Sequence, residues 1–322
     1  MKFSYAFMME WLPRGSWVRN SALRTPFLGV FVFLGAAAVA LAEVPSPTSS
    51  LPFGIRVSIS ARKIKDGHMG QIRVRIPNGV SEAVSAEAVF GETPILFFEK
   101  SSSVSRSLYG LFAVPFNTPV GPNEIKVSLK IGESAREWPL KFDVVSGRYR
   151  GEVLPVDPKF VTLSPEDQSR IELEQKLVGD LYRKSAAPHL WGRGFRKPVK
   201  SRLTRRFGNR RMFNGELQSF HTGADLKAPM GTPVQAAAGG VVVLARDLFF
   251  TGGTVIVDHG LGLLTVYAHL SGYRVKEGQA VEGGQSIAES GSTGRSSGPH
   301  LHWGAVLNRV KFDPLDLLKG VP

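Results

Sequence analysis

The sequence predicts a mainly β protein, with an immunoglobulin-like β-sandwich in its N-terminal half and an antiparallel β-sheet domain after it. Three observations support this prediction. Apolar and polar residues alternate from about residue 53 to 146, which is typical of half-buried strands. From about residue 203, apolar runs alternate with paired glycines, which favour tight turns between strands. Only the segment between these regions has a helical pattern before the C-terminus.

Composition limits the classes of site and partner. The chain has 322 residues, of which 43% are hydrophobic, enough for two packed domains. It has no cysteine, which excludes disulfides and thiolate zinc sites. The formal net charge of +13 favours an anionic polymer or an anionic membrane face as partner. No zinc finger, RNA-binding aromatic signature or basic zipper occurs, so no nucleic-acid partner is expected.

Residues 1–42 have the pattern of an export signal. A basic region precedes the apolar residues 26–42, which end in Ala40-Leu41-Ala42, a small-x-small cleavage site. Cleavage after Ala42 is therefore expected. The alternative is an uncleaved anchor, because roughly 17 apolar residues are the short limit for a membrane span. Both place the protein in the cell envelope, either periplasmic or held at the inner membrane by residues 26–42. A Pro/Ser linker at 43–52 follows.

An accessory domain is predicted at residues 53–146. Alternating or apolar runs lie at 55–59, 72–76, 95–98, 108–114, 125–129 and 140–145. About seven short strands with Gly, Pro and Asn between them predict a small antiparallel immunoglobulin-like sandwich. Its one histidine, His68, lies between Gly67 and Gly70 and is expected in a turn. No catalytic group of residues occurs here, so a placement or binding module is expected.

Residues 147–202 are predicted to connect the two domains. Pro155 and Pro158 indicate irregular structure over 147–163. A helix is expected over about 165–185, since Ser164 is a good N-cap, Pro165 suits the first helical position and Asp167 resembles a capping-box acid. We expect this helix to pack between the domains through one apolar stripe, formed by Ile171, Leu177, Val178, Leu181 and Tyr182.

A basic segment leads into the last domain. Residues 193–211 hold nine Lys or Arg in nineteen positions. One reading is a solvated basic strand. The other is a positive rim beside an active site that attracts an anionic polymer, through Arg205, Arg206, Arg210 and Arg211.

Histidines cluster in the predicted domain at 203–322. The chain has seven, and five fall between residues 221 and 302. In an extended segment, residues i and i+4 share a face, as do i and i+2; His221 can therefore join Asp225, and His300 can join His302. Two imidazoles and one carboxylate suit zinc and leave a fourth position for water. Spacing alone does not decide whether His300 or His302 is the third ligand, and the remaining histidines could move protons or stabilise an oxyanion.

Five motifs in this order resemble the lysostaphin/LytM-type zinc metallopeptidases, which are endopeptidases of bacterial peptidoglycan. The resemblance covers roughly residues 203–318. The motifs are His221-Thr222-Gly223-Ala224-Asp225-Leu226, Ala228-Pro229-x-Gly231-Thr232-Pro233-Val234, Tyr267-Ala268-His269-Leu270, Gly291-Ser292-Thr293-Gly294-Arg295-Ser296 and Gly298-Pro299-His300-Leu301-His302.

The resemblance implies a LytM-type catalytic domain that binds one zinc ion through His221, Asp225 and His302. It makes His269 and His300 the catalytic pair, one acting as general base and the other stabilising the tetrahedral intermediate. It implies peptidoglycan as the substrate and hydrolysis of its peptide cross-links as the activity. Some relatives lack zinc ligands and activate other wall hydrolases instead, so a non-catalytic wall-binding activator is the alternative; every motif position is kept here. The other histidines of this half, His189 and His259, are expected to be structural.

Overall fold

The computed structural model describes residues 51–103, 105–153, 163–185, 188–192, 194–213 and 216–322. The predicted signal or anchor at 1–42 and most of the linker at 43–52 lie outside these residues. Within the described residues, no helix combines the length and the apolar character that crossing a membrane requires.

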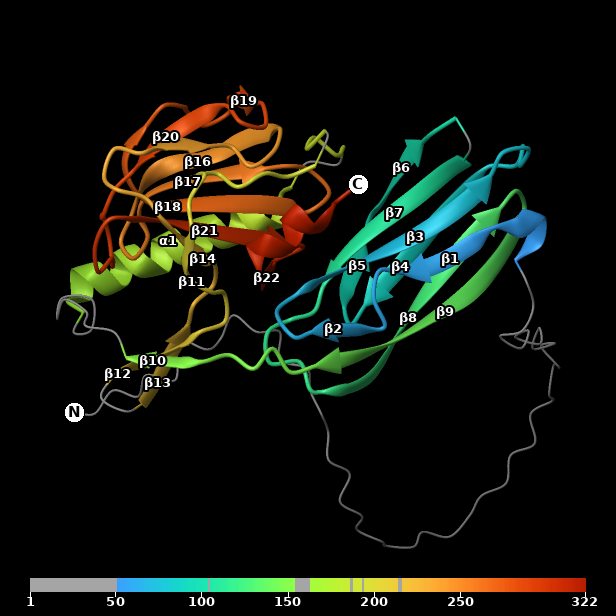
Figure 1. Ribbon diagram of the computed structural model, residues 1–322, viewed down its shortest axis with the longest axis horizontal. Coiled ribbons are helices and arrows are strands. Elements are labelled where there is room, and N and C mark those ends of the chain that lie inside the picture. Colours follow the sequence, from blue (N-terminus) through green and yellow to red (C-terminus); the bar gives the residue numbers. More distant parts are fainter. Residues whose placement is uncertain (1–50, 104, 154–162, 186–187, 193, 214–215) are drawn as a thin grey trace, which may run out of the picture. The chain divides into compact units, whose positions relative to one another are not determined.

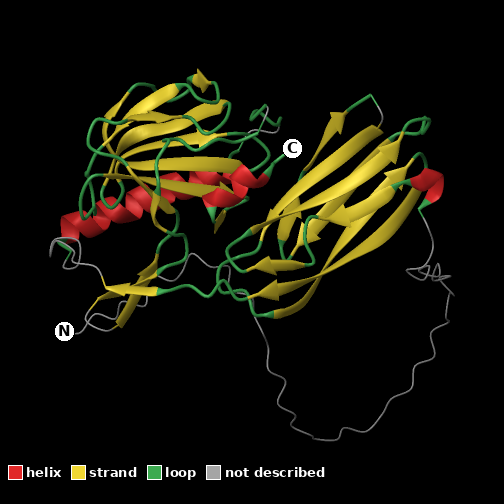
Figure 2. Cartoon of the chain, viewed as in Figure 1, coloured by secondary structure: helices red, strands yellow, loops and turns green. Residues whose placement is uncertain are grey.

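The described chain is almost entirely strand and loop, and α1 (Pro165–Arg183) is its one α-helix (Figure 2). The prediction of a mainly β protein is therefore confirmed. Short 3-10 helices, η2 (Pro52–Gly54) and η4 (Pro314–Lys319), lie near the two ends of the described chain.

Two sheets enclose the core of the first half. One has the order β1-β3-β7-β6 and the other β2-β9-β8-β4-β5. The strand pairs in them are antiparallel except β2 with β9, which is parallel. The described strands are β1 (Arg56–Ile59), β2 (Lys63–Lys65), β3 (Met69–Pro77), β4 (Val84–Phe90), β5 (Thr93–Ile95), β6 (Phe97–Ser101), β7 (Ser105–Ala113), β8 (Gly121–Ile131) and β9 (Ser134–Val145).

Alternation along these strands determines which residues fill this core. In β8, Ile125, Val127 and Leu129 are buried while the residues between them are exposed, as a period of two requires. The rings of Phe90, Phe112 and Phe142 pack in the same core. The immunoglobulin-like classification of this half stays a prediction.

A ten-stranded sheet forms most of the remaining described chain. Its main path is β11-β14-β21-β18-β17-β16-β19, with β15 pairing β20, β20 pairing β18, and β22 pairing β21. Every pair in it is antiparallel. Its strands are β11 (Leu203–Arg205), β14 (Ala224–Lys227), β15 (Pro233–Gln235), β16 (Gly240–Leu248), β17 (Gly252–Asp258), β18 (Leu263–Tyr273), β19 (Ala280–Val281), β20 (Ser286–Ser290), β21 (His300–Leu307) and β22 (Val310–Phe312).

The helix α1 packs on this large sheet (Figure 1). Ser164 caps it, accepting a hydrogen bond from the Asp167 N–H, and Pro165 begins it, as predicted. Tyr182 is buried with Leu244 and Ile256 of β16 and β17. We expected this helix to pack between the domains, and its described contacts show that this expectation is wrong. The apolar stripe of the helix packs against β16 and β17 of the ten-stranded sheet.

The connector is not wholly irregular, which corrects the prediction for residues 147–163. Strand β10 (Gly151–Val153) pairs in parallel with β12 (Arg210–Phe213), and β12 pairs antiparallel with β13 (Glu216–Phe220). These strands form a separate small sheet (Figure 1). Since β13 ends at Phe220, this sheet leads directly into His221.

Candidate metal centre

Three neighbouring strands and one loop carry the five candidate side chains. Asp225 lies on β14, His300 and His302 on β21, and His269 on β18. The strand order β14-β21-β18 places Asp225 opposite His302 and Ala268 opposite His302 on the other side. Direct cross-strand neighbours have adjacent side chains on one face, so the β14–β21 register brings Asp225 and His302 together. His269 follows Ala268, at a point where a positive φ and a register shift interrupt β18. His221 enters from the loop before β14.

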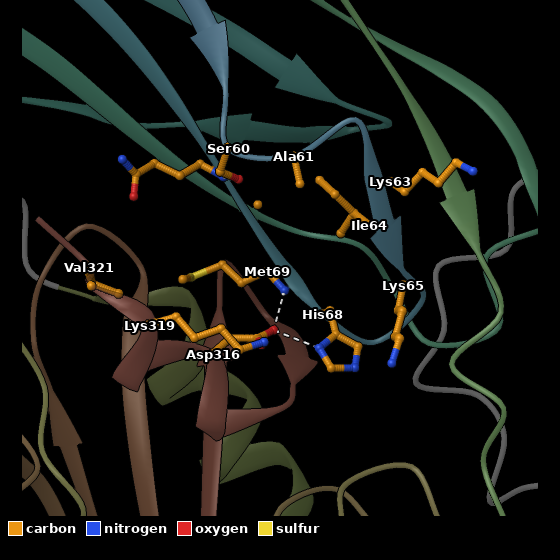
Figure 3. Close-up of a pocket in the computed structure, with 13 residues that line it drawn as sticks. Ser60, Ala61, Lys63, Ile64, Lys65, His68, Met69, Asp316, Lys319 and Val321 are labelled. Carbon is orange, nitrogen blue, oxygen red and sulfur yellow. Dashed lines mark hydrogen bonds and ion pairs between the residues drawn. The ribbon is translucent and has the colours of Figure 1, made fainter.

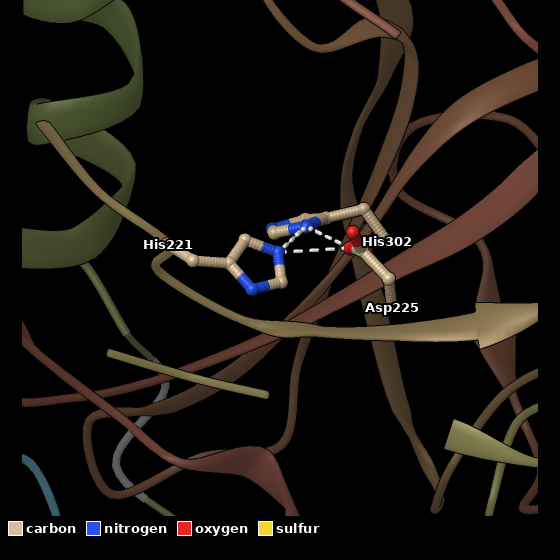
Figure 4. A group of neighbouring side chains, drawn as sticks. All are labelled: His221, Asp225 and His302. Atoms are coloured by element: carbon tan, nitrogen blue, oxygen red, sulfur yellow. Dashed lines mark hydrogen bonds and ion pairs between the residues drawn. The ribbon is translucent and has the colours of Figure 1, made fainter. Parts of the chain in front are cut away.

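The side chains of His221, Asp225 and His302 converge on one point (Figure 4). Nε2 of His221 lies 2.9 Å from Oδ1 of Asp225 and 3.0 Å from Nδ1 of His302. Nδ1 of His302 lies 2.9 Å from the same Oδ1. All three residues are buried. Each therefore offers one ligand atom to a common centre.

Proton positions in this triad show that the residues fit a cation. Nδ1 of His221 lies 2.7 Å from the carbonyl oxygen of Arg206, so Nδ1 carries the proton and Nε2 carries the lone pair in the neutral ring. That lone pair points at a carboxylate oxygen, and two acceptors at this distance repel each other. A metal ion among the three atoms removes the conflict, and the tautomer is the one that metal ligation by Nε2 requires.

The charge of Asp225 agrees with this arrangement. Burial by itself would raise the pKa of this carboxyl, but the side chains of His221 and His302 outweigh burial and lower it far below its usual range. The group is therefore ionised in the folded protein. Its second oxygen, Oδ2, is buried and has no hydrogen bond; Nε2 of His300 lies 3.5 Å from it and Nη1 of Arg205 3.8 Å from it.

His269 and His300 form a second pair beside the triad, with ring centroids 4.8 Å apart. Nδ1 of His269 donates to the carbonyl of Thr293 at 2.8 Å, and Nδ1 of His300 donates to that of Gly298 at 2.7 Å. In both neutral rings the lone pair is therefore on Nε2. Burial, followed by the charges of His302 and His300, lowers the pKa of His269 to about 3. The His269 ring is thus uncharged near pH 7.

Glycines allow the close approach of the segments that hold these rings. A Cβ on Gly223 would lie 2.7 Å from the His302 ring, and so would collide with it. Gly252 and Gly294 have φ of 59° and 67° and lie against each other. This contact fixes the loop at Thr293, whose carbonyl holds His269. Glycine is needed at these positions because a side chain would meet backbone atoms or a ligand ring.

Comparison with known proteins decides the family. The profile of Peptidase family M23 matches residues 219–314. A solved structure described as an M23 peptidase from Pseudomonas aeruginosa superposes with a TM-score of 0.57 and 30% identity, over 76% of this chain and 92% of that one. The chain belongs to peptidase family M23.

Curated relatives of this M23 chain are similar over its C-terminal part. It is 40% identical over 124 residues to the DD-carboxypeptidase/endopeptidase Mpg of Neisseria meningitidis serogroup B, an alignment covering 38% of this chain and 29% of the relative. It is 43% identical over 99 residues to the peptidoglycan DD-endopeptidase ShyA of Vibrio cholerae, covering 31% and 22%. The chain thus spans less than a third of the length of these relatives.

M23 peptidases depend on zinc, and two imidazoles with one carboxylate are a donor set that zinc accepts in catalytic sites. Zinc is therefore the metal for this M23 protein. The structure brings together all five residues that the sequence singled out, with His302 rather than His300 in the triad. The choice that spacing left open depends on register, because His302, not His300, is the direct neighbour of Asp225.

Two other histidines have structural surroundings in the described chain. His259 is fully buried and bonds the carbonyl of Gly239 through Nδ1, with Nε2 2.7 Å from Thr265 Oγ1. His189 stacks on Phe98 at 4.9 Å. Sequence reasoning did not find the carbonyls of Arg206, Thr293 and Gly298. Since every residue has a carbonyl, no residue type marks these positions.

Proposed function

We propose that this protein is a zinc-dependent endopeptidase that hydrolyses peptide cross-links of bacterial peptidoglycan. The observation that carries the proposal is the buried triad beside two histidines whose Nδ1 atoms lie within hydrogen-bond distance of main-chain carbonyls. Two relatives, at 43% and 38% identity, are named peptidoglycan DD-endopeptidases, which favours a cross-link between D-residues as the target.

In this proposal His221, Asp225 and His302 hold the metal. Zinc, when bound, lowers the pKa of a water molecule to about 7 and polarises the scissile carbonyl. The protein's part is to hold the three ligand atoms in place. The Arg206 carbonyl orients His221, and strand register orients Asp225 and His302.

His269 and His300 would then handle protons. Nε2 of either ring can accept a proton from the attacking water and return it to the leaving amine. Their Nδ1 atoms are held by carbonyls, which keeps both rings in one orientation. Burial lowers the pKa of His269, so that ring is uncharged at neutral pH and its Nε2 can accept a hydrogen bond.

The test uses the zinc-loaded protein, a defined DD-cross-linked muropeptide and mass spectrometry of the products. His302→Ala and Asp225→Ala should lose both zinc and hydrolysis, whereas His300→Ala and His269→Ala should keep zinc and lose at least about 100-fold in rate, the usual contribution of a general acid or base. His189→Ala is the matched control and should retain both. Stoichiometric zinc in Asp225→Ala would contradict the ligand assignment. No release of new amines by the zinc-loaded wild type would contradict the hydrolase and favour the activator.

The other proposals concern the rest of the chain. Residues 53–146 would be an immunoglobulin-like module that places the catalytic domain at 203–322 on the wall. Residues 1–42 would export the chain to the envelope, where peptidoglycan lies. Amino-terminal sequencing of protein taken from the envelope tests the cleaved signal, since an intact Met1 would contradict cleavage after Ala42.

A further inference from the structure

Four aromatic rings from four parts of the chain pack together beside the segments that hold His221. Phe116 lies in the loop between β7 and β8, Tyr149 follows β9, Phe207 lies between β11 and β12, and Phe220 ends β13 directly before His221. The Phe116 ring centroid is 4.3 Å from that of Phe220, 4.7 Å from that of Tyr149 and 6.1 Å from that of Phe207. Such separations are those of packed rings. We call these four side chains the Phe116 cluster.

The cluster adjoins the segment that orients His221. The Gly208 N–H donates to the carbonyl of His221 at 2.7 Å, and the His221 N–H donates to the carbonyl of Asn209 at 2.8 Å. The ring of His221 donates to the carbonyl of Arg206 at 2.7 Å. Main chain and ring of this ligand are thus both fixed by residues 206–209. Phe207, a member of the cluster, lies inside that segment.

On its other side the cluster is attached to the first half of the chain. The Tyr149 hydroxyl donates to the carbonyl of Asp66. The carboxylate of Asp66 accepts the N–H groups of Asn117, at 3.1 Å, and Gly147, at 2.6 Å, which flank the cluster residues Phe116 and Tyr149. Asp66 is buried, so these bonds are shielded from water. The loop that presents Phe116 is therefore held rigidly.

Two glycines show how close this contact is. A Cβ on Gly67 would meet the rings of Phe207 and Tyr149, and one on Gly208 would meet the ring of Tyr149. Strand pairing adds a further connection, since the Arg210 N–H donates to the carbonyl of Arg150 at 2.8 Å at the start of the β10–β12 pair. The first half thus contacts the His221 segment through rings and main chain together.

We propose that the N-terminal sheets position the metal ligand His221 through the Phe116 cluster, which makes Phe116 a positioning residue for zinc binding. The inference rests on the proposed ligand role of His221. A metal site binds tightly only if its ligands are already in place, and loss of groups that orient a ligand typically costs about 10–100-fold in metal affinity. Without the Phe116 ring, the loop at 206–209 loses one of its packing partners, and His221 is held less firmly in its orientation.

Zinc affinity of the full chain, measured by competition with a chelating indicator, tests this. Phe116→Ala should weaken zinc binding about 10-fold, and Phe116→Leu, which keeps much of the apolar contact, should restore most of it. The matched control is Phe90→Ala. Phe90 is also a half-buried phenylalanine that packs on two rings, but those rings, Phe112 and Phe142, lie in the N-terminal core. Phe90→Ala should lower the unfolding temperature and leave zinc affinity unchanged.

Hydrogen exchange of the metal-free protein gives a readout that is independent of zinc. The amides of Gly208 and His221 should exchange faster in Phe116→Ala and at the wild-type rate in Phe90→Ala. Equal effects of the two variants on zinc affinity, or unchanged affinity and exchange in Phe116→Ala, would overturn the inference. His221→Ala separates this failure from failure of the proposed function: if His221→Ala keeps zinc, the ligand assignment is wrong; if it loses zinc while Phe116→Ala binds normally, only the inference is wrong.

Discussion

His269 has a backbone conformation that non-glycine residues seldom adopt within a strand. Its φ is 62°, in the left-handed region, which costs an L-residue roughly 1–2 kcal/mol. Its N–H donates to the carbonyl of Thr251 and its ring to that of Thr293. These hydrogen bonds keep His269 in this unfavourable backbone conformation. The register of the strand pairing shifts next to it. Strain of this kind is typical of functional positions.

The strain predicts an unusual order of stability among variants of His269. Glycine adopts positive φ at no steric cost, so His269→Gly should be more stable than His269→Ala by about 1 kcal/mol, although both lack the ring. Urea unfolding of the metal-free proteins measures the difference. Ala268→Gly is the control, because Ala268 has no positive φ, and there glycine should destabilise. His269→Gly being the less stable of the pair would contradict the strain.

His259 illustrates a buried histidine whose role is structural. It lies in a polar network with the Gly239 carbonyl, Thr265 and Tyr267, whose hydroxyl also accepts the Ala237 N–H. Burial lowers the pKa of His259 to about 4, against the partial opposing effects of Gly239 and Asp258. The folded protein therefore keeps this ring neutral at pH values where the unfolded chain protonates it.

This difference predicts how stability depends on pH. The unfolded chain binds the extra proton between pH 6.5 and about 4, so the contribution to stability is complete above pH 6.5 and is lost as pH falls through this window. From pH 7.5 to 5, His259 should account for a loss of about 2 kcal/mol. In His259→Gln this part should disappear. Urea titrations of both proteins at the two pH values measure it, and equal pH dependence in both would reject the assignment.

The local sequence pattern predicted most helices and strands. It failed for a strand whose pairing partner lies far away in the sequence. The ends of the alternating strands β3 and β8 lie within four residues of their predicted places, and the cap of α1 is the predicted Ser164. Strand β10 was missed because it has only three residues and because its parallel partner, β12, is distant in sequence: Gly151 pairs with Arg210, 59 positions later. No periodicity marks so short a strand.

The N-cap of α1 predicts that two of its serines differ in how much their replacement by alanine destabilises the protein. Ser164 accepts the Asp167 N–H at 3.1 Å, and its replacement by alanine should destabilise the protein by about 1 kcal/mol. Ser169, inside the same helix, only donates back to the carbonyl of Pro165, and alanine has the higher helix propensity there. Ser169→Ala should therefore be neutral or stabilising. Thermal unfolding compares the two, and equal losses would show that the cap contributes nothing specific.

At the scale of the whole molecule, the metal centre was more predictable than the contact between the two halves. Motif spacing singled out the five site residues, four of which lie on strands, and register makes His302 the direct neighbour of Asp225. The contact between the two halves joins two surfaces whose residues lie far apart in the sequence. Figure 3 shows the carboxylate of Asp316 beside His68 and the Met69 N–H at the wall of a cavity, both at 2.9 Å. His68 was expected only in a turn, and it follows one, but its ring also joins this contact.

Replacement of Asp316 tests whether the two halves of the chain unfold together. Burial alone would raise its pKa, but His68, Lys319 and the Met69 N–H outweigh burial and lower it, so the group is charged when it accepts these bonds. Asp316→Ala leaves the Met69 N–H and the His68 ring without this acceptor, at roughly 1–3 kcal/mol for each group that stays buried.

Calorimetry measures the consequence. If the halves of the wild type unfold together, the calorimetric and van't Hoff enthalpies of unfolding agree. In Asp316→Ala the N-terminal sheets and the ten-stranded sheet should unfold separately. The transition should therefore broaden, and the two enthalpies should diverge. Asp180→Ala is the control, since Asp180 pairs only with Arg183 on the surface of α1, and it should leave the shape of the transition unchanged. A transition in Asp316→Ala as sharp as that of the wild type would show that the remaining contacts, such as the Asp313 N–H on the Gly67 carbonyl, are sufficient to keep the halves together.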